Sequence, residues 1–186
     1  LELGAGPAHK NINDIIGQVD RMSKWVRELL QSLRPLNDDA EPVNLVAAIH
    51  DSLMAFEQQI TRAGVKVEFN PQQTPMVLSQ HMQLTQILNS LMANALEAMD
   101  KGGKLTITLE PADARGVCVV LSDTGKGMSE EQRKMAFRPF FTTKTGGLGV
   151  GLVLVKRIME RFGGGVALGS REGEGTCVRL SFKLVP

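Results

Sequence analysis

The sequence of 186 residues lacks the features that mark several classes of protein. Its net charge of +1 gives no indication of a nucleic-acid or anionic-membrane partner. No apolar run approaches the roughly 20 residues of a membrane span, and no signal peptide is visible. The two cysteines, Cys118 and Cys177, lie in strand-like runs, which predicts buried thiols in a reducing, cytoplasmic compartment. Because the chain begins with Leu1, we expect a piece of a longer protein, whose parent can be membrane-anchored.

Two familiar phosphate-binding loops are also missing. The P-loop string GxxxxGK[ST] does not occur, and no GxGxxG fingerprint follows a strand. Instead Gly147, Gly149 and Gly151 stand at every second position before an amphipathic helix pattern. Taken alone, this spacing is a weak signal, because a helix behind a glycine-rich loop occurs in many proteins. It indicates only that something approaches the backbone too closely for side chains there. A bound phosphate chain is the first candidate.

Hydrophobic periodicity predicts helices and mostly antiparallel strands without regular alternation. Helices are expected at residues 44–64, with Asn44 as N-cap, at 81–100 and at 150–164, and strands at 65–69, 104–110, 116–123, 165–170 and 176–184. Residues 124–147 carry no clear core pattern. This order favours an α+β two-layer sandwich, with helices on one face of a mixed, mostly antiparallel sheet, over a doubly wound sheet.

The N-terminal region has its own pattern. Apolar residues with heptad spacing lie at Ile12, Ile15, Val19, Met22, Val26, Leu29 and Leu33. Such a coiled-coil-like helix cannot bury its apolar stripe alone, so we expect a homodimer through it. We therefore divide the chain into a helix at 1–35, a linker at 36–43, where prolines bracket acidic residues, and a main domain at 44–186.

Four motifs occur together in the main domain. They are Asn94 in the helix "NSLMANALEAM", the turn "SDTGKGM", the lid segment "FRPFFTTK" (residues 137–144) and the glycine box "GLGVGL". In this order they resemble the catalytic domain of sensor histidine kinases, whose GHKL superfamily includes type II topoisomerases and the ninety-kilodalton heat-shock chaperone. The resemblance implies a Bergerat-type ATP-binding fold, and the last two motifs look like the nitrogen-regulator branch. Residues 1–35 resemble the second helix of the dimerisation domain.

The resemblance implies a role for each motif. The implied nucleotide-binding residues are Asn94, Ala98, Asp123, Gly125, Gly127, Met128, Thr142, Thr143, Lys144, Gly147, Leu148, Gly149, Val150, Gly151, Leu152 and Thr176. Asp123 would accept a hydrogen bond from the adenine amino group, where guanine offers a carbonyl. Asn94 would bind Mg²⁺ through its amide oxygen, and Lys144 would neutralise charge on the transferred phosphate. As structural alternatives, Asp123 is a turn residue, Thr176 a strand former, and Asn94 a buried cap.

The implied reaction is transfer of the ATP γ-phosphoryl group to a histidine on a partner helix of the parent kinase, and then to the receiver domain of a response regulator. The acceptor motif of the family is absent, and none of His9, His50 and His81 is expected to have a neighbouring carboxylate that takes the imidazole's proton. Ser90 stands where related hydrolases carry a water-activating glutamate, which favours transfer over hydrolysis, although Glu97 offers a carboxylate on a nearby face of the same helix. A superfamily ATPase and a nucleotide-binding regulatory module without kinase activity remain the alternatives.

Overall fold

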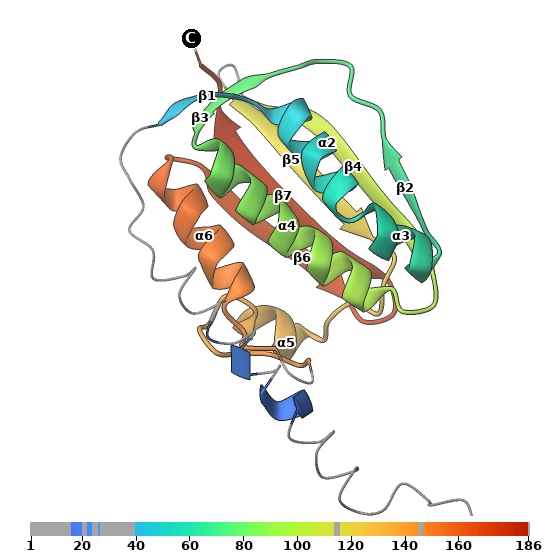
Figure 1. The fold of residues 1–186 in the computed structure, drawn as a ribbon. Helices are drawn as coiled ribbons and strands as arrows, with labels where there is room; N and C mark the ends of the chain where they lie inside the picture. Colours follow the sequence, from blue (N-terminus) through green and yellow to red (C-terminus); the bar gives the residue numbers. More distant parts are fainter. Residues whose placement is uncertain are drawn as a thin grey trace, which may run out of the picture.

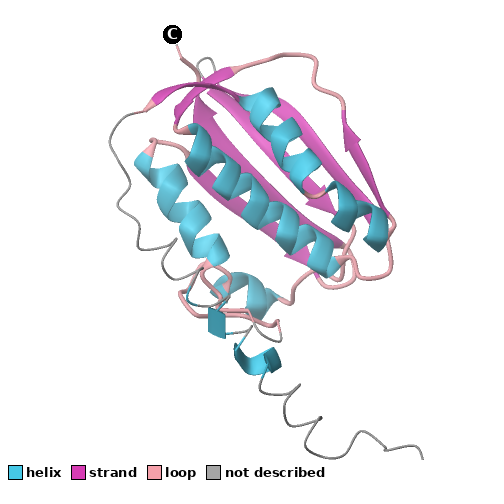
Figure 2. Cartoon of the chain, in the orientation of Figure 1, coloured by secondary structure: helices cyan, strands magenta, loops and turns pink. Residues whose placement is uncertain are grey.

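The computed structural model describes residues 16–19, 22–23, 26, 40–113, 116–144 and 147–185. Within residues 40–185, helices cover one face of a five-stranded sheet (Figure 1; Figure 2). This is the α+β two-layer arrangement that the sequence predicts. Within the described ranges, every helix is too short or too polar to cross a lipid bilayer.

The main sheet is mixed and mostly antiparallel, as expected. Its order is β2 (Val65–Phe69), β4 (Gly103–Asp113), β5 (Gly116–Asp123), β7 (Gly175–Lys183) and β6 (Gly165–Arg171). Among its described strands, β2 and β4 pair in parallel and the other neighbours pair antiparallel. Alternate residues of β5, namely Val117, Val119 and Leu121, enter the core because successive side chains of a strand point to opposite faces. The strands expected from alternation are therefore all found.

Helix α4 (His81–Ala98) crosses the middle of the sheet between α2 (Leu45–Ala55) and α6 (Gly151–Arg161) (Figure 1). Its buried residues recur at the helical spacing of three and four, as Leu84, Leu88, Leu91 and Ala95 do. Helix α6 buries Leu154, Val155, Ile158 and Met159 in the same way. The C-terminal end of α4 lies beside the turn after β5, because the Lys126 N–H donates to the Ala98 carbonyl oxygen at 3.0 Å.

The helix expected at residues 44–64 is divided into α2 and α3 (Glu57–Ala63), which corrects that prediction. Its expected start is confirmed, because the Ala47 backbone N–H donates to Asn44 Oδ1 at 3.0 Å. The break lies at Phe56, whose φ and ψ of −102° and 4° are not helical and whose ring packs against the core. Gly64 then ends α3 in the left-handed conformation.

Two short strands were not predicted from the sequence. β1 (Glu41–Asn44) and β3 (Met76–Ser79) form an antiparallel pair with Val43 opposite Val77, both of them buried. β1 lies across the expected junction between the linker at 36–43 and the main domain. Four residues are too few for an alternating pattern to stand out, and only the pairing partner makes these segments strands.

The heptad pattern of the N-terminal helix falls largely outside the described residues. Residues 16–19, 22–23 and 26 are helical, and Ile16, Val19, Met22 and Val26 are exposed. Ile12, Ile15, Leu29 and Leu33 are among the positions that the structure does not describe. The long helix and the homodimer therefore stay predictions.

Candidate functional site

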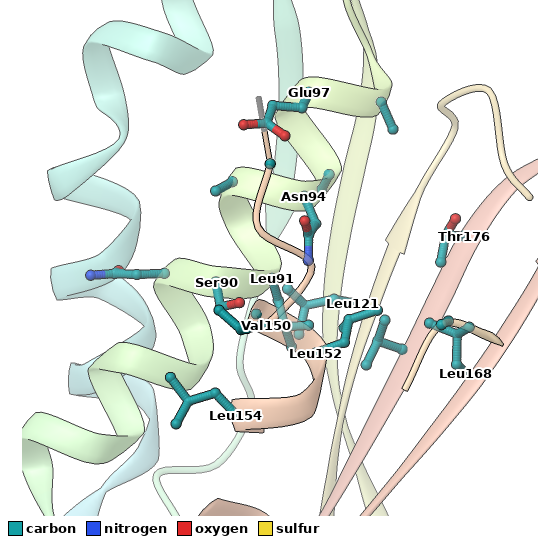
Figure 3. A pocket seen from close by; sticks show the side chains of 18 of the residues that line it. Ser90, Leu91, Asn94, Glu97, Leu121, Val150, Leu152, Leu154, Leu168 and Thr176 are labelled. Carbon is teal, nitrogen blue, oxygen red and sulfur yellow. The ribbon is translucent and has the colours of Figure 1, made fainter. Parts of the chain in front are cut away.

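One cavity of about 1070 Å³ opens between α4, α6 and the ends of β5 and β7 (Figure 3). Except for Gly125, all the residues that the motifs singled out line it: Asn94, Ala98, Asp123, Gly127, Met128, Thr142, Thr143, Lys144, Gly147, Leu148, Gly149, Val150, Gly151, Leu152 and Thr176. Segments far apart in the chain thus meet around one space.

The floor of the cavity is built on Asp123, the last residue of β5. Its Oδ1 accepts the backbone N–H of Gly125 at 2.9 Å and that of Thr176 at 3.3 Å. Burial raises the pKa of the Asp123 carboxyl, and these two backbone donors act in the opposite direction. Among the described residues no donor reaches Oδ2, so this acceptor is open to a ligand that offers an N–H.

Thr176 lies directly opposite Asp123 in the β5–β7 register. Its backbone N–H, rather than its hydroxyl, contacts the carboxylate, because the hydroxyl oxygen lies 2.9 Å from Ser170 Oγ. Thr176 therefore supports the Asp123 carboxylate through its backbone, which the strand pairing positions. Its side chain still faces the cavity (Figure 3).

Gly125 has a structural function. A Cβ added to it would lie 2.6 Å from the carbonyl oxygen of Ala98, the last residue of α4. The Lys126 N–H donates to the same oxygen at 3.0 Å. This close approach fastens the turn after β5 to the end of α4, and it explains why Gly125 supports the cavity without lining it.

Two leucines complete an apolar wall that the motifs did not single out. Leu121 lies two residues before Asp123 on the same face of β5, and it pairs through Val178 of β7 with Leu168 of β6. Figure 3 has Leu121, Leu152 and Leu168 around one part of the cavity. The signal was present in the sequence, since strand residues two apart share a face.

Lys144, at the end of the lid segment, contacts α4. Its ammonium donates a hydrogen bond to Asn94 Oδ1 and lies 2.6 Å from Glu97 Oε2. Asn94 and Glu97 are three residues apart, so they share one side of the helix. The predicted residues Asn94 and Lys144 therefore lie together, and Glu97, which lies in the same motif helix but was not among the predicted site residues, is the third member of the cluster.

The glycine box leads into the N-terminus of α6. Gly149 has φ of +71°, and a Cβ on it would lie 2.4 Å from the Phe141 carbonyl oxygen. A Cβ on Gly151 would lie 2.8 Å from Ser90 Oγ, so two small residues let α6 approach α4. Val150 caps α6 without a side-chain hydrogen bond, and the first N–H groups of the helix therefore lack a side-chain acceptor. These N–H groups and the helix dipole suit an anion in the cavity.

The segment at 124–147, in which no core pattern was seen, contains one more element. Helix α5 (Glu130–Met135) begins with a capping box, in which Ser129 Oγ accepts the Gln132 N–H and Gln132 Oε1 accepts the Ser129 N–H. The spacing S-x-x-Q is a readable helix signal that the sequence reasoning missed. Beyond α5, Phe141 lines the cavity, whereas Phe140 is exposed and has a positive φ of 64°.

Two of the three histidines lie in described helices. The ring of His50 in α2 packs on Phe69, with centroids 5.2 Å apart. His81 Nε2 lies 3.7 Å from Asp51 Oδ2, so the expectation that no histidine has a neighbouring carboxylate was wrong. α2 and α4 bring together two residues 30 positions apart, which their spacing in the sequence does not reveal. His9 lies outside the described residues.

A family model described as "Histidine kinase-, DNA gyrase B-, and HSP90-like ATPase" matches residues 79–186, more than half of the chain. The chain belongs to this ATPase family. The match includes α4, the turn after β5, the lid segment and the glycine box, and so covers the whole cavity wall described above. The chain is thus a GHKL-type ATP-binding catalytic domain, and the cavity lies within the residues that the family model matches.

This ATPase-family domain is similar to sensor histidine kinases in particular. ZraS of Escherichia coli (strain K12) is 32% identical over 176 residues, which cover 94% of this chain and 38% of ZraS. Sporulation kinase E of Bacillus subtilis (strain 168) is 28% identical over 170 residues, covering 91% of this chain and 23% of that kinase. The chain therefore spans less than two-fifths of the length of these curated relatives.

Solved structures of histidine kinases share the fold. The nucleotide-free catalytic domain of histidine kinase ThkA superposes with a TM-score of 0.71 at 29% identity, covering 80% of this chain and 99% of that one. ThkA in complex with the response regulator protein TrrA gives 0.77 at 27% identity, covering 98% and 53%. The mixed sheet with helices on one face is thus the arrangement of a histidine kinase catalytic domain.

Proposed function

We propose that the chain is the catalytic region of a sensor histidine kinase, which binds Mg-ATP and transfers the γ-phosphoryl group to a histidine of its dimerisation domain. One observation carries this proposal. The open Oδ2 of Asp123, the N-terminus of α6 and the Lys144–Asn94 pair all face a single cavity. These are a hydrogen-bond acceptor for a base, backbone donors for phosphates and a cation for the transferred group.

The ATP would lie with its adenine at the floor and its phosphates toward α6. Asp123 Oδ2 would accept a hydrogen bond from the adenine amino group, and the guanine carbonyl in the same place would leave two acceptors facing each other. The apolar wall of Leu121, Leu152 and Leu168 would pack on the base. The N–H groups at Gly149–Gly151 would face the phosphates.

The oxygen atoms on α4 suit Mg²⁺. Asn94 Oδ1 and the Glu97 carboxylate together already contact a cationic group, the Lys144 ammonium, and both are the hard oxygen donors that Mg²⁺ prefers. Asn94 would bind the metal directly, as the motif implies. When bound, Mg²⁺ neutralises charge across the phosphate oxygens.

In the proposed transfer, a nitrogen of the acceptor imidazole bonds to the γ-phosphorus while the bond from this phosphorus to the ADP oxygen breaks. ADP leaves with that electron pair, and the imidazolium proton passes to a base beside the acceptor. Lys144 stabilises the charge on the transferred group. Ser90 has no carboxylate with which to activate water, which disfavours the ATPase alternative.

The acceptor lies, in this proposal, on a helix of the parent kinase outside this chain. His81 has a carboxylate partner, but it precedes Asn94 by 13 residues of one helix, which is about 20 Å along the axis. In-line attack on the γ-phosphorus needs contact distance, so His81 is too far away. We therefore expect the chain to bind ATP without phosphorylating itself.

The decisive experiment uses γ-labelled ATP. The chain alone should take up no acid-labile label, and a fragment of the parent kinase that carries its acceptor histidine should become labelled when it is added in trans. Asn94→Ala should abolish this labelling, whereas Asn70→Ala, in a loop far from the cavity, should leave it intact. Phosphate release that does not need the fragment would favour the ATPase, and ATP binding without either reaction would favour the regulatory module.

Finer features of the proposal rest on the sequence. "PFFTTK" and "GLGVGL" support the nitrogen-regulator-like branch. The exposed Ile16, Val19, Met22 and Val26 support residues 1–35 as a dimerisation helix, followed by the linker at 36–43 and the catalytic domain at 44–186, in a cytoplasmic homodimer. Light scattering over a range of concentrations checks the dimer. A response-regulator receiver domain is the proposed next acceptor, as the ThkA–TrrA complex suggests.

A further inference from the structure

Glu97 is unexplained by the four motifs, yet it holds the charged group of the lid segment. Its Oε2 lies 2.6 Å from Lys144 Nζ, and the same ammonium donates to Asn94 Oδ1. Figure 3 places Asn94 and Glu97 on adjacent turns of α4 at one end of the cavity. The side chains of Lys144 and Glu97 are 35% and 48% exposed, so competing ions can reach the pair.

We infer that Glu97 is a positioning residue that makes nucleotide binding depend on Mg²⁺. Glu97 holds the Lys144 ammonium against Asn94 Oδ1. The ammonium thus occupies the position proposed above for the metal ion. Lys144 leaves this place when the metal–nucleotide binds, and it then meets the phosphates. This inference rests on the proposed function, because it assumes that ATP phosphates reach this end of the cavity.

The charges explain the dependence. Without metal, the Glu97 carboxylate repels the phosphates and also withholds Lys144 from them. With metal, the same carboxylate lies beside a divalent cation and attracts it. One negative charge therefore weakens metal-free binding and strengthens metal-bound binding.

Glu97 has no other basic partner in the described part of the cavity wall. His81 and Lys126 are the remaining basic side chains that line the cavity there, and neither forms an ion pair with Glu97. His81 pairs with Asp51 at the far end of α4. Among these basic side chains, Lys144 is therefore the one that the metal ion would replace beside Glu97.

Calorimetry with ATP, once with Mg²⁺ and once with EDTA, tests the inference. Glu97→Gln should tighten metal-free binding and gain less from Mg²⁺, so that the ratio of the two dissociation constants falls about fivefold, the effect of one partly exposed charge. Glu97→Asp, which keeps the charge, should restore part of the ratio. The control is Glu68→Gln, because Glu68 forms a 2.8 Å pair with Lys104 of similar exposure on the sheet, and its ratio should not change. An unchanged ratio in Glu97→Gln would overturn the inference.

A second background separates positioning from simple repulsion. In Lys144→Gln there is no ammonium to release, so Glu97→Gln should tighten metal-free binding less than it does in the unmodified chain. An equal gain in both backgrounds would mean that Glu97 acts through its own charge only, and would exclude the positioning of Lys144.

The contact itself can be tested without nucleotide. Acylation of Lys144 by an amine-reactive ester, followed by mass spectrometry of its peptide, should be several-fold faster in Glu97→Gln than in the unmodified chain or in Glu68→Gln. Equal rates would remove the proposed contact. Because this measurement needs no ATP, a chain that fails to bind ATP but gives the faster acylation would contradict the proposed function and leave the Glu97–Lys144 contact standing.

Discussion

The floor and the rim of the cavity are held in different ways. At the floor, Asp123 is fixed by two backbone N–H groups, and Gly125 lies against the Ala98 carbonyl with no room for a side chain. At the rim, the contacts between Lys144 and α4 in the described part of the chain are side-chain contacts that water can reach. Backbone contacts between packed elements keep one geometry, whereas a half-exposed ion pair exchanges partners easily. The floor therefore suits recognition of a base, and the rim suits a step in which a cation must move.

The largest effect is expected from Asp123→Asn, which changes the floor and leaves the rim as it is. The remaining oxygen would still accept the N–H groups of Gly125 and Thr176, and the new amide N–H₂ would face the amino group of adenine. Two donors then oppose each other at a cost of a few kcal/mol, so ATP affinity should fall about 100-fold. The GTP carbonyl, in contrast, would meet a donor. Calorimetric titration with both nucleotides measures the change.

The unmodified chain provides the reference for this test, and it should bind ATP far more tightly than GTP. If ATP and GTP bind equally well to it, Asp123 does not read the base. A circular-dichroism melt of Asp123→Asn serves as the control for folding, because the loss of affinity should occur in a folded protein.

The second prediction concerns the stability of the floor, which depends on Gly125 although this residue does not line the cavity. Gly125→Ala should lower the free energy of unfolding by about 2 kcal/mol, because its Cβ would lie 2.6 Å from a backbone oxygen that cannot move aside cheaply. Gly169→Ala is the matched control, since the nearest atom to its Cβ would be 4.0 Å away. Urea unfolding of both variants measures the difference. Equal stabilities would show that the turn after β5 is not fastened to α4 in this way.

The floor could be predicted largely from the sequence, for a physical reason. Asp123, Gly125 and Gly127 lie within five residues of the chain, and the strand pattern before them indicates where the turn begins. The helices with a clear apolar spacing, α4 and α6, were predicted for the same reason. Both predictions used only the spacing of residues within short stretches of the chain.

The contacts of the rim and the smaller elements could not be predicted from the sequence, because they depend on residues that only the folded chain brings together. Glu97 and Lys144 are far apart in the chain, and nothing in their spacing indicates an ion pair. The same holds for His81 with Asp51 and for the pairing of β1 with β3. The break at Phe56 is a tertiary effect as well, because the ring packs against the core and the local helix pattern continues through it.

A pH series gives a smaller effect that also belongs to the floor. Burial raises the pKa of Asp123, so the carboxyl takes up a proton in the folded protein at a pH at which the unfolded chain is still ionised. Its ionised form therefore costs stability above the folded pKa, and the cost is relieved as the pH falls through that pKa. ATP affinity should fall over the same window, because a protonated Oδ2 no longer accepts. Asp123→Asn should lose both dependences.

Calorimetry and thermal unfolding between pH 4 and 7 check this prediction. The titration of the nucleotide itself is common to both proteins, so the difference between the unmodified chain and Asp123→Asn isolates the carboxyl. A difference that stays constant across the window would contradict a raised pKa.

The last prediction concerns local opening, which should differ between β5 at the floor and the lid segment at the rim. β5 lies between β4 and β7, so the amides of Val117–Leu121 should exchange with solvent only through large-scale unfolding. The lid segment has few backbone hydrogen bonds, such as that from Phe140 N–H to the Gly149 carbonyl at 3.1 Å, and its amides should open at little cost in free energy. Hydrogen exchange read by mass spectrometry should therefore be fast in the lid segment and slow in β5. An ATP analogue with Mg²⁺ should slow the lid segment and leave β5 nearly unchanged, because only the rim has contacts left to form. If both segments are equally protected before and after the analogue is added, the rim is as rigid as the floor, and the exchange of partners by Lys144 loses its structural basis.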